Sequence, residues 1–490
     1  MAAELSEDLI EPKLTLPGVE VYIGDAIDVV HKLVPKYGGK INTMITSPPY
    51  FNLRDYGTST WEGGDADCDH GIKRQHGSAK VVDVAQSGHA AKENKLNRKV
   101  CKCGAARVDQ QIGLENTVEA YVNRLADLFD SIGECLLRPD GSLWINLGDS
   151  YAGSGGAGGD YNPGGLREGQ PKWKPPKTEW PTKSLMMVPE RFALEMIRRG
   201  WILRNKVIWF KGKDVDKILE DEDGGAPTSN GMPVSAEDRL KGTYEVVFHF
   251  VRQRRYFYDL DAIREAHTTS ERFEGREPNF APHAYMPDSG VPGYRNRAGG
   301  DGVGFNCRGR NPGDMWAIPT SPFPMAHFAT FPPALVHRPV KATCPETICR
   351  KCGKPRKAIQ ESTGVIQKRE PTHTPLHKPT KVDSTGWTPA NLPTGTYTDC
   401  GCNAGWEGGI VLDPFGGSGS TAQGAFEARP PKVIDGYTCQ PKVILIDLDE
   451  RNLQIIEKRL TGRAKQSRKP DLSKYGEWGE GHSNPEDIGG

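Results

Sequence analysis

The sequence contains no long apolar run. No stretch of its 490 residues approaches the roughly 18 consecutive apolar residues of a membrane-spanning helix. Its first ten residues, MAAELSEDLI, are acidic and lack the cationic start and apolar centre of a secretory signal. We therefore expect a cytoplasmic protein that does not enter a membrane. Its 57 glycines and 38 prolines indicate many loops around a globular core.

The chain also lacks a net charge, because 63 Lys and Arg residues balance 63 Asp and Glu residues. This balance argues against a protein that binds nucleic acid through a global positive charge alone. The charge is nonetheless uneven, since residues 341–381 hold ten Lys or Arg and three Glu. Such a run is either a solvated surface or a patch that contacts a polyanion, and composition leaves both readings open.

No internal repeat is visible, and short apolar segments alternate with segments of helical periodicity. The predicted strands are 19–23, 41–45, 142–147, 201–209, 244–251, 410–412 and 443–446, and the predicted helices are 26–34, 117–137, 189–199, 450–460 and one that starts near 421. Residues 138–141, RPDG, predict a turn. This alternation predicts an α/β fold with a Rossmann-like, mostly parallel central sheet covered by helices on both faces.

A proline-rich segment, Thr46–Tyr50 (TSPPY), directly follows the predicted strand 41–45. Its two prolines hold the backbone extended and remove two N–H donors. What remains is a row of acceptors, the Ser47 hydroxyl and nearby carbonyls, beside the ring of Tyr50. Such a row suits a substrate amine on a flat ring, although an ordinary Pro-Pro turn would have the same sequence.

A glycine-rich turn, Asp413–Thr421 (DPFGGSGST), joins strand 410–412 to the next helix. Glycines let backbone N–H groups approach a ligand closely, and a helix N-terminus favours a negative group. No Lys follows the last glycine, so the turn is not a phosphate-binding P-loop, nor is it a clean dinucleotide fingerprint. Asp447 ends the following strand, where an acid can bond ribose hydroxyls. Together these features predict a nucleoside cofactor.

In this order the two segments resemble the amino-methyltransferases of DNA, in the circularly permuted arrangement called the beta group, where the catalytic tetrapeptide precedes the cofactor loop. Four further pieces follow the family's order. They are 24–26 (GDA), 141–151 (GSLWINLGDSY), the strands 200–211 with 244–250, and 327–332 (HFATFP). The resemblance implies methyl transfer from S-adenosylmethionine to the exocyclic amine of a flipped-out base.

The resemblance also implies roles for named residues. The exocyclic amine is a weak nucleophile, so the protein must orient it and stabilise the positive charge that it gains. Ser47, through its hydroxyl, and the Pro48 carbonyl would accept the amine hydrogens, Pro49 would hold the geometry, and Tyr50 would stack on the base. The implied cofactor-binding residues are Asp25, Thr46, Phe328, Thr330, Asp413, Phe415, Gly416, Gly417, Ser418, Gly419 and Asp447. Among these, Asp25 would lie near the adenine and Asp447 would bond the ribose.

Ser47 also bears on the choice of base. Within this family Ser in the first position is more typical of N4-cytosine enzymes, and Asp of N6-adenine enzymes. We expect the N4 amine of cytosine, with the N6 amine of adenine as the alternative. RNA or a protein amide is a rival substrate, although Asn in the first position is typical of protein-amide enzymes. A non-catalytic zinc-dependent DNA-binding protein on this scaffold is a rival of another class, and it would need neither motif.

Eleven cysteines occur, mostly in clusters, which in a cytosolic protein indicates metal binding rather than disulfides. Cys349, Cys352, Cys400 and Cys402 form two close pairs that predict a structural, tetrahedral zinc site. Cys344 could replace one of these four.

A second set, Cys68, His70, Cys101 and Cys103, has tighter spacing, so it predicts a structural zinc site less strongly. His76 and His89 are competing ligands, and a loop without metal is the alternative.

We expect a discontinuous catalytic domain with insertions. The domain comprises 1–57, 109–260, 326–343 and 403–462, and the other segments are 58–108 with the second cysteine set, the target-recognition region 261–325, the zinc-binding insertion 344–402 and a flexible tail, 463–490. Arg and Asn in 261–325, together with the basic run of the zinc-binding insertion, would read the target sequence. The expected partner is double-stranded DNA, and the resemblance also allows a restriction endonuclease.

Overall fold

The computed structural model describes residues 10–53, 60–65, 67–68, 101, 103–108, 110–153, 180–212, 237–265, 310–321, 330–356, 358–362 and 391–462. Several predictions fall outside these residues. They concern His70, His76, His89, Phe328, the tail 463–490, and most of the region 261–325. Among the helices of the described part, none has the length and apolar character needed to cross a membrane.

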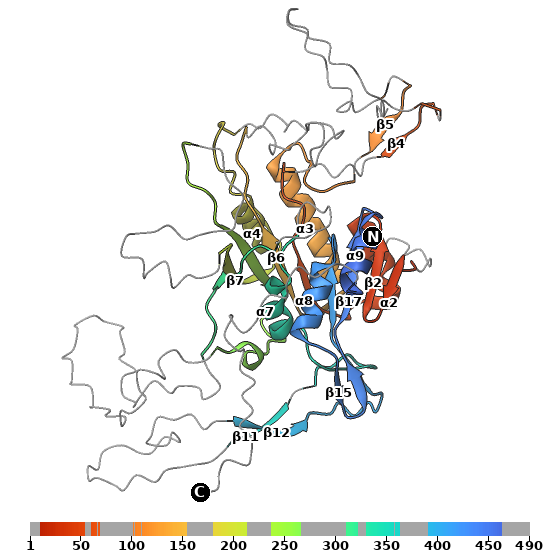
Figure 1. The fold of residues 1–490 in the computed structure, drawn as a ribbon, viewed down its shortest axis with the longest axis vertical. Coiled ribbons are helices and arrows are strands. Elements are labelled where there is room, and N and C mark those ends of the chain that lie inside the picture. The colour runs from red at the N-terminus through yellow and green to blue at the C-terminus, as the bar shows by residue number, and fades with distance from the viewer. Residues whose placement is uncertain are drawn as a thin grey trace, which may run out of the picture.

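A nine-stranded sheet forms the centre of the molecule (Figure 1), in the order β1-β2-β17-β14-β3-β6-β8-β7-β9. The strands are β1 (Leu14–Leu16), β2 (Val19–Ile23), β3 (Ile41–Thr46), β6 (Leu137–Leu147), β7 (Ile202–Phe210), β8 (Tyr244–Val251), β9 (Met315–Ala317), β14 (Ile410–Asp413) and β17 (Lys442–Asp447). The run from β2 to β6 is parallel throughout, whereas β8 lies antiparallel between β6 and β7. The predicted mostly parallel sheet is confirmed.

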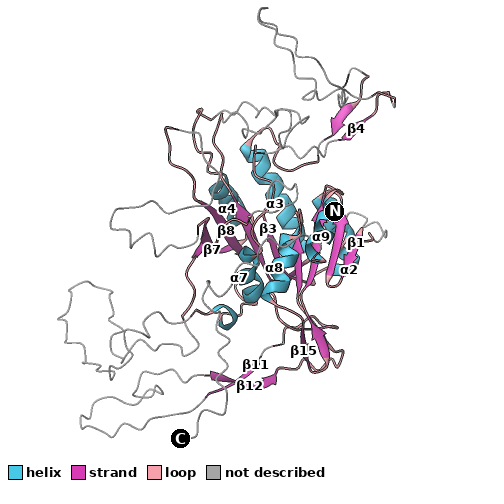
Figure 2. Cartoon of the chain, in the orientation of Figure 1, coloured by secondary structure: helices cyan, strands magenta, loops and turns pink. Residues whose placement is uncertain are grey.

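Helices cover both faces of this sheet (Figure 2). The larger core cluster lies under α1 (Ala26–Lys32), α3 (Val118–Cys135) and α4 (Val188–Arg198). The second cluster lies under α7 (Ala334–Thr343), α8 (Ser420–Ala428) and α9 (Asn452–Leu460). Central strands are therefore buried on both sides, which is why all six residues of β3 are buried and its sequence shows no alternation.

Smaller elements complete the described chain. They are the short helix α2 (Val34–Tyr37), the 3-10 turn Asp261–Ile263, and four two-stranded pairs, β4 (Thr60–Glu62) with β5 (Ala106–Val108), β10 (Ile348–Cys349) with β13 (Trp406–Glu407), β11 (Ala358–Ser362) with β12 (Asn391–Tyr397), and β15 (Lys432–Ile434) with β16 (Tyr437–Cys439). β4 and β5 lie at the opposite end of the molecule from β11, β12 and β15 (Figure 1). The insertions therefore leave the sheet at both of its ends.

Two sequence predictions about local structure are wrong. The predicted helix 26–34 stops at Leu33, and a separate turn, α2, follows. Pro35 has no N–H to donate to the carbonyl four residues earlier, so α1 cannot continue through it. Residues 138–141, predicted as a turn, belong to β6. Ile41 pairs with Leu137 and Thr43 with Ser142, so a bulge in β6 accommodates the proline and glycine without a chain reversal.

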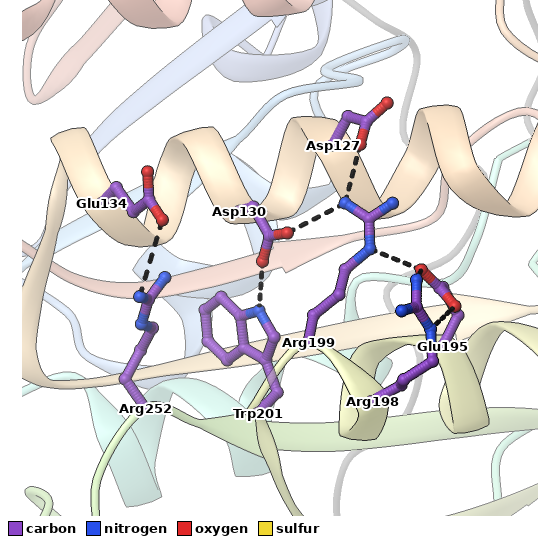
Figure 3. A network of polar contacts seen from close by, with 8 residues as sticks. All are labelled: Asp127, Asp130, Glu134, Glu195, Arg198, Arg199, Trp201 and Arg252. Atoms are coloured by element: carbon purple, nitrogen blue, oxygen red, sulfur yellow. Dashed lines mark hydrogen bonds and ion pairs between the residues drawn. The ribbon is translucent and has the colours of Figure 1, made fainter. Parts of the chain in front are cut away.

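A charged network joins α3 to α4 and β7 (Figure 3). Arg199, at the end of α4, donates to Asp127 at 2.7 Å and to Asp130 at 2.9 Å, both on α3. Asp130 also accepts the indole N–H of Trp201 at 2.7 Å, and Glu195 bonds Arg199 from within α4. These contacts fix α3 against the sheet, which matters for the site because α3 carries a residue that reaches the TSPPY segment.

Glu20 on β2 is the centre of a second polar cluster. Its carboxylate accepts hydrogen bonds from the Tyr22 and Tyr37 hydroxyls, both at 2.6 Å, and contacts Lys36 and Lys442, both at 2.9 Å. Burial alone would raise the pKa of Glu20, but these four donors outweigh it and lower the pKa to about 2.

We predict that Glu20→Gln lowers the free energy of unfolding by about 2 kcal/mol at pH 7. The pKa is depressed in the folded state, so the stabilisation is complete above the unfolded value near 4.5 and is lost as the pH falls toward 2. Urea unfolding at pH 7 and pH 3 measures this, and the gap between variant and wild type should narrow at pH 3. Glu119→Gln, at an exposed ion pair, is the control and should change stability by under about 0.5 kcal/mol. A gap that does not depend on pH would contradict the assignment.

Candidate active site at the carboxyl ends of β3 and β14

The two motifs singled out in the sequence meet at one edge of the sheet. β3 and β14 are neighbouring parallel strands, with Met44 opposite Leu412, so their carboxyl ends lie side by side. The Thr46 hydroxyl donates to Asp413 Oδ1 at 2.6 Å, joining residues 367 positions apart. The TSPPY segment and the glycine-rich turn therefore share one site.

Asp413 organises the start of the glycine-rich turn. Its carboxylate is fully buried and accepts hydrogen bonds from three groups: the Thr46 hydroxyl, the Thr421 hydroxyl and the Phe415 N–H, the last at 3.0 Å. Burial raises the pKa of Asp413 to about 6, and the three donors oppose that rise. Its oxygens thus bind the protein itself, and they hold the turn in place between β14 and α8.

The turn then passes close to β17. The Gly416 N–H donates to the Ile446 carbonyl at 2.8 Å, and a Cβ at Gly416 would fall 2.9 Å from the Leu445 side chain. Gly417 and Gly419 have positive φ angles of 49° and 79°, which favour glycine. This backbone brings the N-terminus of α8 to the edge of the sheet, beside the half-buried ring of Phe415 and the buried Ser418.

Asp447 and Asp25 end the two adjacent parallel strands. Asp447 Oδ2 accepts the Gly417 N–H at 2.6 Å, while Oδ1 accepts the Asp449 N–H and the Asn452 side chain. Burial raises the pKa of Asp447. Asp25 caps the N-terminus of α1, with Oδ1 accepting the Ile27 N–H at 2.9 Å. The predicted cofactor acids therefore lie along one edge, each with some of its oxygens bound by protein N–H groups.

The TSPPY segment is held by residues that the sequence did not single out. The Tyr50 hydroxyl donates to Glu245 Oε2 at 2.7 Å and accepts the Asn146 side-chain N–H at 2.7 Å. The Ser47 hydroxyl donates to the Tyr50 oxygen at 3.2 Å. The Pro49 carbonyl accepts the Tyr121 hydroxyl of α3 at 2.8 Å. Asn146 and Glu245 lie in the strands whose resemblance to the family was noted, and that was the available signal.

Tyr50 is fixed by packing as well. Its ring lies against Gly148, where a Cβ would fall 2.6 Å from a ring carbon. Burial and the charge of Glu245 raise the pKa of Tyr50 well above its usual value, so its hydroxyl is a neutral donor. Among the other predicted residues, Thr330 directly precedes Phe331, which lines a small cavity with Thr46.

Comparison with known families identifies the scaffold. The model of N6 and N4 methyltransferases, described as DNA methylase, matches residues 41–349, more than half of the 490 residues. The chain belongs to this DNA methylase family. The matched range includes Ser47 to Tyr50 and ends before the glycine-rich turn.

Several relatives are similar to this chain. Type II methyltransferase M.SfiI of Streptomyces fimbriatus is 31% identical over 261 residues, which are 53% of this chain and 42% of that protein. M.Cfr9I of Citrobacter freundii is 28% identical over 330 residues, 66% of this chain and 72% of that protein. The chain thus spans less than half the length of the first relative. Among solved structures, PvuII DNA methyltransferase (cytosine-N4-specific) has 12% identity and a TM-score of 0.42, covering 95% of this chain and 93% of that one.

Four cysteines of the chain lie together outside the site. The Sγ atoms of Cys349, Cys352, Cys400 and Cys402 all lie within 4.8 Å of one another. Tetrahedral zinc with bonds of about 2.3 Å places its sulfurs about 3.8 Å apart, so the spacing fits such an ion. Cys344 does not belong to this group, because its Sγ lies apart from the four and contacts the Pro345 carbonyl at 3.9 Å. The suggestion that it replaces one ligand is wrong.

The other set brings three thiols together. Cys68, Cys101 and Cys103 lie within 4.8 Å of one another, with 3.7 Å between the Sγ atoms of Cys68 and Cys101. They lie beside β4 and β5, in the insertion that follows the carboxyl end of β3. Cys349 and its partners instead lie in the segment between α7 and β14, beside β10 and β13.

We predict that Thr46→Val lowers the free energy of unfolding by about 1–3 kcal/mol, because it leaves one oxygen of the buried Asp413 carboxylate short of a donor. It should also raise the pKa of Asp413 further above about 6. Since the pKa of Asp413 is raised on folding, the folded state gains stability as the pH falls from about 6 toward 4. In the variant this gain in stability should begin at a higher pH. Urea unfolding between pH 4 and pH 8 measures both effects. Thr461→Val, at an exposed helix end, is the control, and equal losses in the two variants would contradict the prediction.

Proposed function

We propose that this chain transfers a methyl group from S-adenosylmethionine to the exocyclic amine of a base in double-stranded DNA. The observation that carries the proposal is the hydrogen bond between Thr46 and Asp413, which joins the TSPPY segment to the glycine-rich turn. Membership of the DNA methylase family and the type II methyltransferases among its relatives support it. A non-catalytic DNA-binding protein would have no use for this junction.

The residues present fit the cofactor. The N–H groups at the start of α8, which no side chain caps, suit a carboxylate, such as that of the methionine part. Asp447 suits ribose hydroxyls, since each of its oxygens has two lone pairs and Oδ2 accepts a single described N–H. Asp25 lies near the same edge of the sheet, where its carboxylate would contact the adenine. When bound, the cofactor supplies an electrophilic methyl group.

The residues around Ser47 would hold the amine and stabilise its developing charge. The Ser47 proton is directed at Tyr50 and one lone pair of its oxygen accepts from Asn146, so the second lone pair can accept an amine hydrogen. In the described part of the chain no donor reaches the Pro48 carbonyl, which leaves it available as a second acceptor. The Tyr121 contact to Pro49 holds this backbone extended. Preorganised acceptors of this kind stabilise a nitrogen that becomes cationic.

Cytosine N4 is the favoured target and adenine N6 the alternative, on the basis of Ser in the first position of the tetrapeptide. A restriction endonuclease is a proposed partner, in line with the type II names of the relatives. We also propose structural zinc at Cys349, Cys352, Cys400 and Cys402. A second zinc would bind Cys68, Cys101 and Cys103, with His70 as the expected fourth ligand, and the region 261–325 would read the target sequence.

We predict that the wild-type protein labels duplex DNA with methyl groups from labelled S-adenosylmethionine, and that Ser47→Ala and Tyr50→Ala slow this at least roughly tenfold. Glu190→Gln, on the outer surface of α4, is the control and should label as fast as wild type. Equal rates in all four proteins would contradict the site, whereas a folded wild type that labels no DNA would contradict the function. Sequencing that distinguishes methylated bases, applied to DNA from expressing cells, then identifies both base and target sequence.

We predict that replacing Cys349 and Cys352 together with Ser removes one zinc ion per chain, because two thiolates cannot hold the ion alone. Metal analysis of the purified protein measures the ratio. Cys135→Ala, a half-buried thiol outside both clusters, is the control and should leave zinc unchanged. Zinc content equal to wild type in the double variant would reject the site.

A further inference from the structure

Asn146 carries a buried acceptor with nothing bound to it. The residue is 3% exposed on β6, and within the described chain its Oδ1 atom has no hydrogen-bond partner. Its side-chain N–H groups, in contrast, are shared among Tyr50 at 2.7 Å, Glu245 at 2.9 Å and Ser47 at 3.3 Å. A buried acceptor without a donor is costly, and an apolar side chain of the same shape would avoid that cost. The arrangement is therefore suited to a ligand that brings an N–H group.

Glu245 determines which way the Asn146 amide faces. An ionised carboxylate only accepts hydrogen bonds, so the atom of Asn146 that lies 2.9 Å from Glu245 Oε2 must be the nitrogen. The reverse orientation would place two acceptors against each other. Lys211, at the end of β7, forms an ion pair with the other oxygen of Glu245 and holds it in place. Lys211 and Tyr50 are the titratable groups that contact this carboxylate in the described part of the chain.

The same residue opens toward the reaction side of the sheet. Asn146 lines a cavity of about 10 Å³, enough for one water-sized group, together with Thr46, Val247 and Phe331. Thr46 is the residue that joins the two motifs, and Ser47 follows it. In the sheet order β14-β3-β6, Asn146 thus lies beside the TSPPY segment, on the side away from the glycine-rich turn.

We propose that Asn146 Oδ1 is a further acceptor for the target amine, and that Glu245 is a positioning residue that keeps this oxygen turned toward the substrate. The proposal rests on the proposed function. As the N–C bond forms and the S–C bond breaks with its electron pair passing to sulfur, the nitrogen becomes cationic. It then loses one proton to water. Ser47 Oγ, the Pro48 carbonyl and Asn146 Oδ1 together surround this charge with acceptors.

The test couples a protein group to a substrate group. Duplexes carrying the target sequence, mapped as described above, are prepared with the normal target base or with hydrogen in place of its amino group. The dissociation constants of both duplexes are measured for wild type, Asn146→Leu and Glu245→Gln in the presence of S-adenosylhomocysteine. The change in this ratio from wild type to a variant isolates the contact to the amine, because the weaker base pair of the second duplex affects every protein equally.

We expect the ratio to shift about fivefold away from the amino duplex in each variant relative to wild type, as for the loss of one hydrogen bond. Glu245→Gln is the more informative variant. Glutamine keeps the shape of Glu245 but can donate a hydrogen bond, which allows the Asn146 amide to reverse its orientation. Single-turnover methyl transfer should fall about tenfold or more in Glu245→Gln, with the dissociation constant of the amino duplex changing by less than the rate. A role in packing alone would not alter the ratio.

Controls separate the outcomes. Glu190→Gln makes the same chemical change on the far side of the sheet and should keep the wild-type ratio. Melting temperatures establish that each variant folds, and if Asn146→Leu does not, Glu245→Gln decides. Wild-type ratios in both folded variants would overturn the assignment of Asn146 while leaving the proposed function intact. Absence of methyl transfer by wild type would overturn the proposed function itself, which the labelling experiment detects independently of these ratios.

Discussion

The site depends on one buried carboxylate. Asp413 binds Thr46 from one motif and Thr421 and the Phe415 N–H from the other, so a single side chain sets the distance between them. Its full burial makes the arrangement stiff, because any movement of either segment would leave a charged oxygen without a donor. The separation between the TSPPY segment and the glycine-rich turn is thereby built into the core, instead of depending on a flexible loop.

The parallel sheet explains why residues so far apart in the chain converge. β2, β17, β14, β3 and β6 all point the same way, so each delivers the residue after its last position to the same edge. Asp447, Asp413 and Thr46 are at or next to strand ends for this reason. Insertions can leave the sheet at either end without disturbing that edge, which lets one scaffold carry two separate cysteine clusters.

The features of the fold and site that could be predicted from the sequence are those that local interactions determine. Buried strands such as 443–446 were predicted because they read as apolar runs, and both motifs were found because glycine and proline carry their own backbone geometry. Asn146 and Glu245 were not singled out, because their role depends on the register of β6 against β8, where Asn146 pairs with Val247. An antiparallel register between distant segments leaves no mark in either sequence. The bulge over residues 138–141 was missed for the same reason, since only the pairing with β3 keeps it extended.

A buried acid, Asp413, and a partly buried acid, Glu245, shape this site, and neither is expected to contact the reacting nitrogen. Asp413 accepts hydrogen bonds from the glycine-rich turn and so fixes its backbone. Glu245 accepts hydrogen bonds from Tyr50 and Asn146 and so fixes the direction of these two side chains. These contacts set the direction of the hydrogen bonds. A carboxylate only accepts, so each neighbour must point its N–H or O–H group toward it. The acceptor atoms of those neighbours are then left facing outward. An amine that becomes a cation is stabilised by hydrogen-bond acceptors. A carboxylate that lies behind these acceptors orients them, and it does not itself form an ion pair with the product that would slow product release.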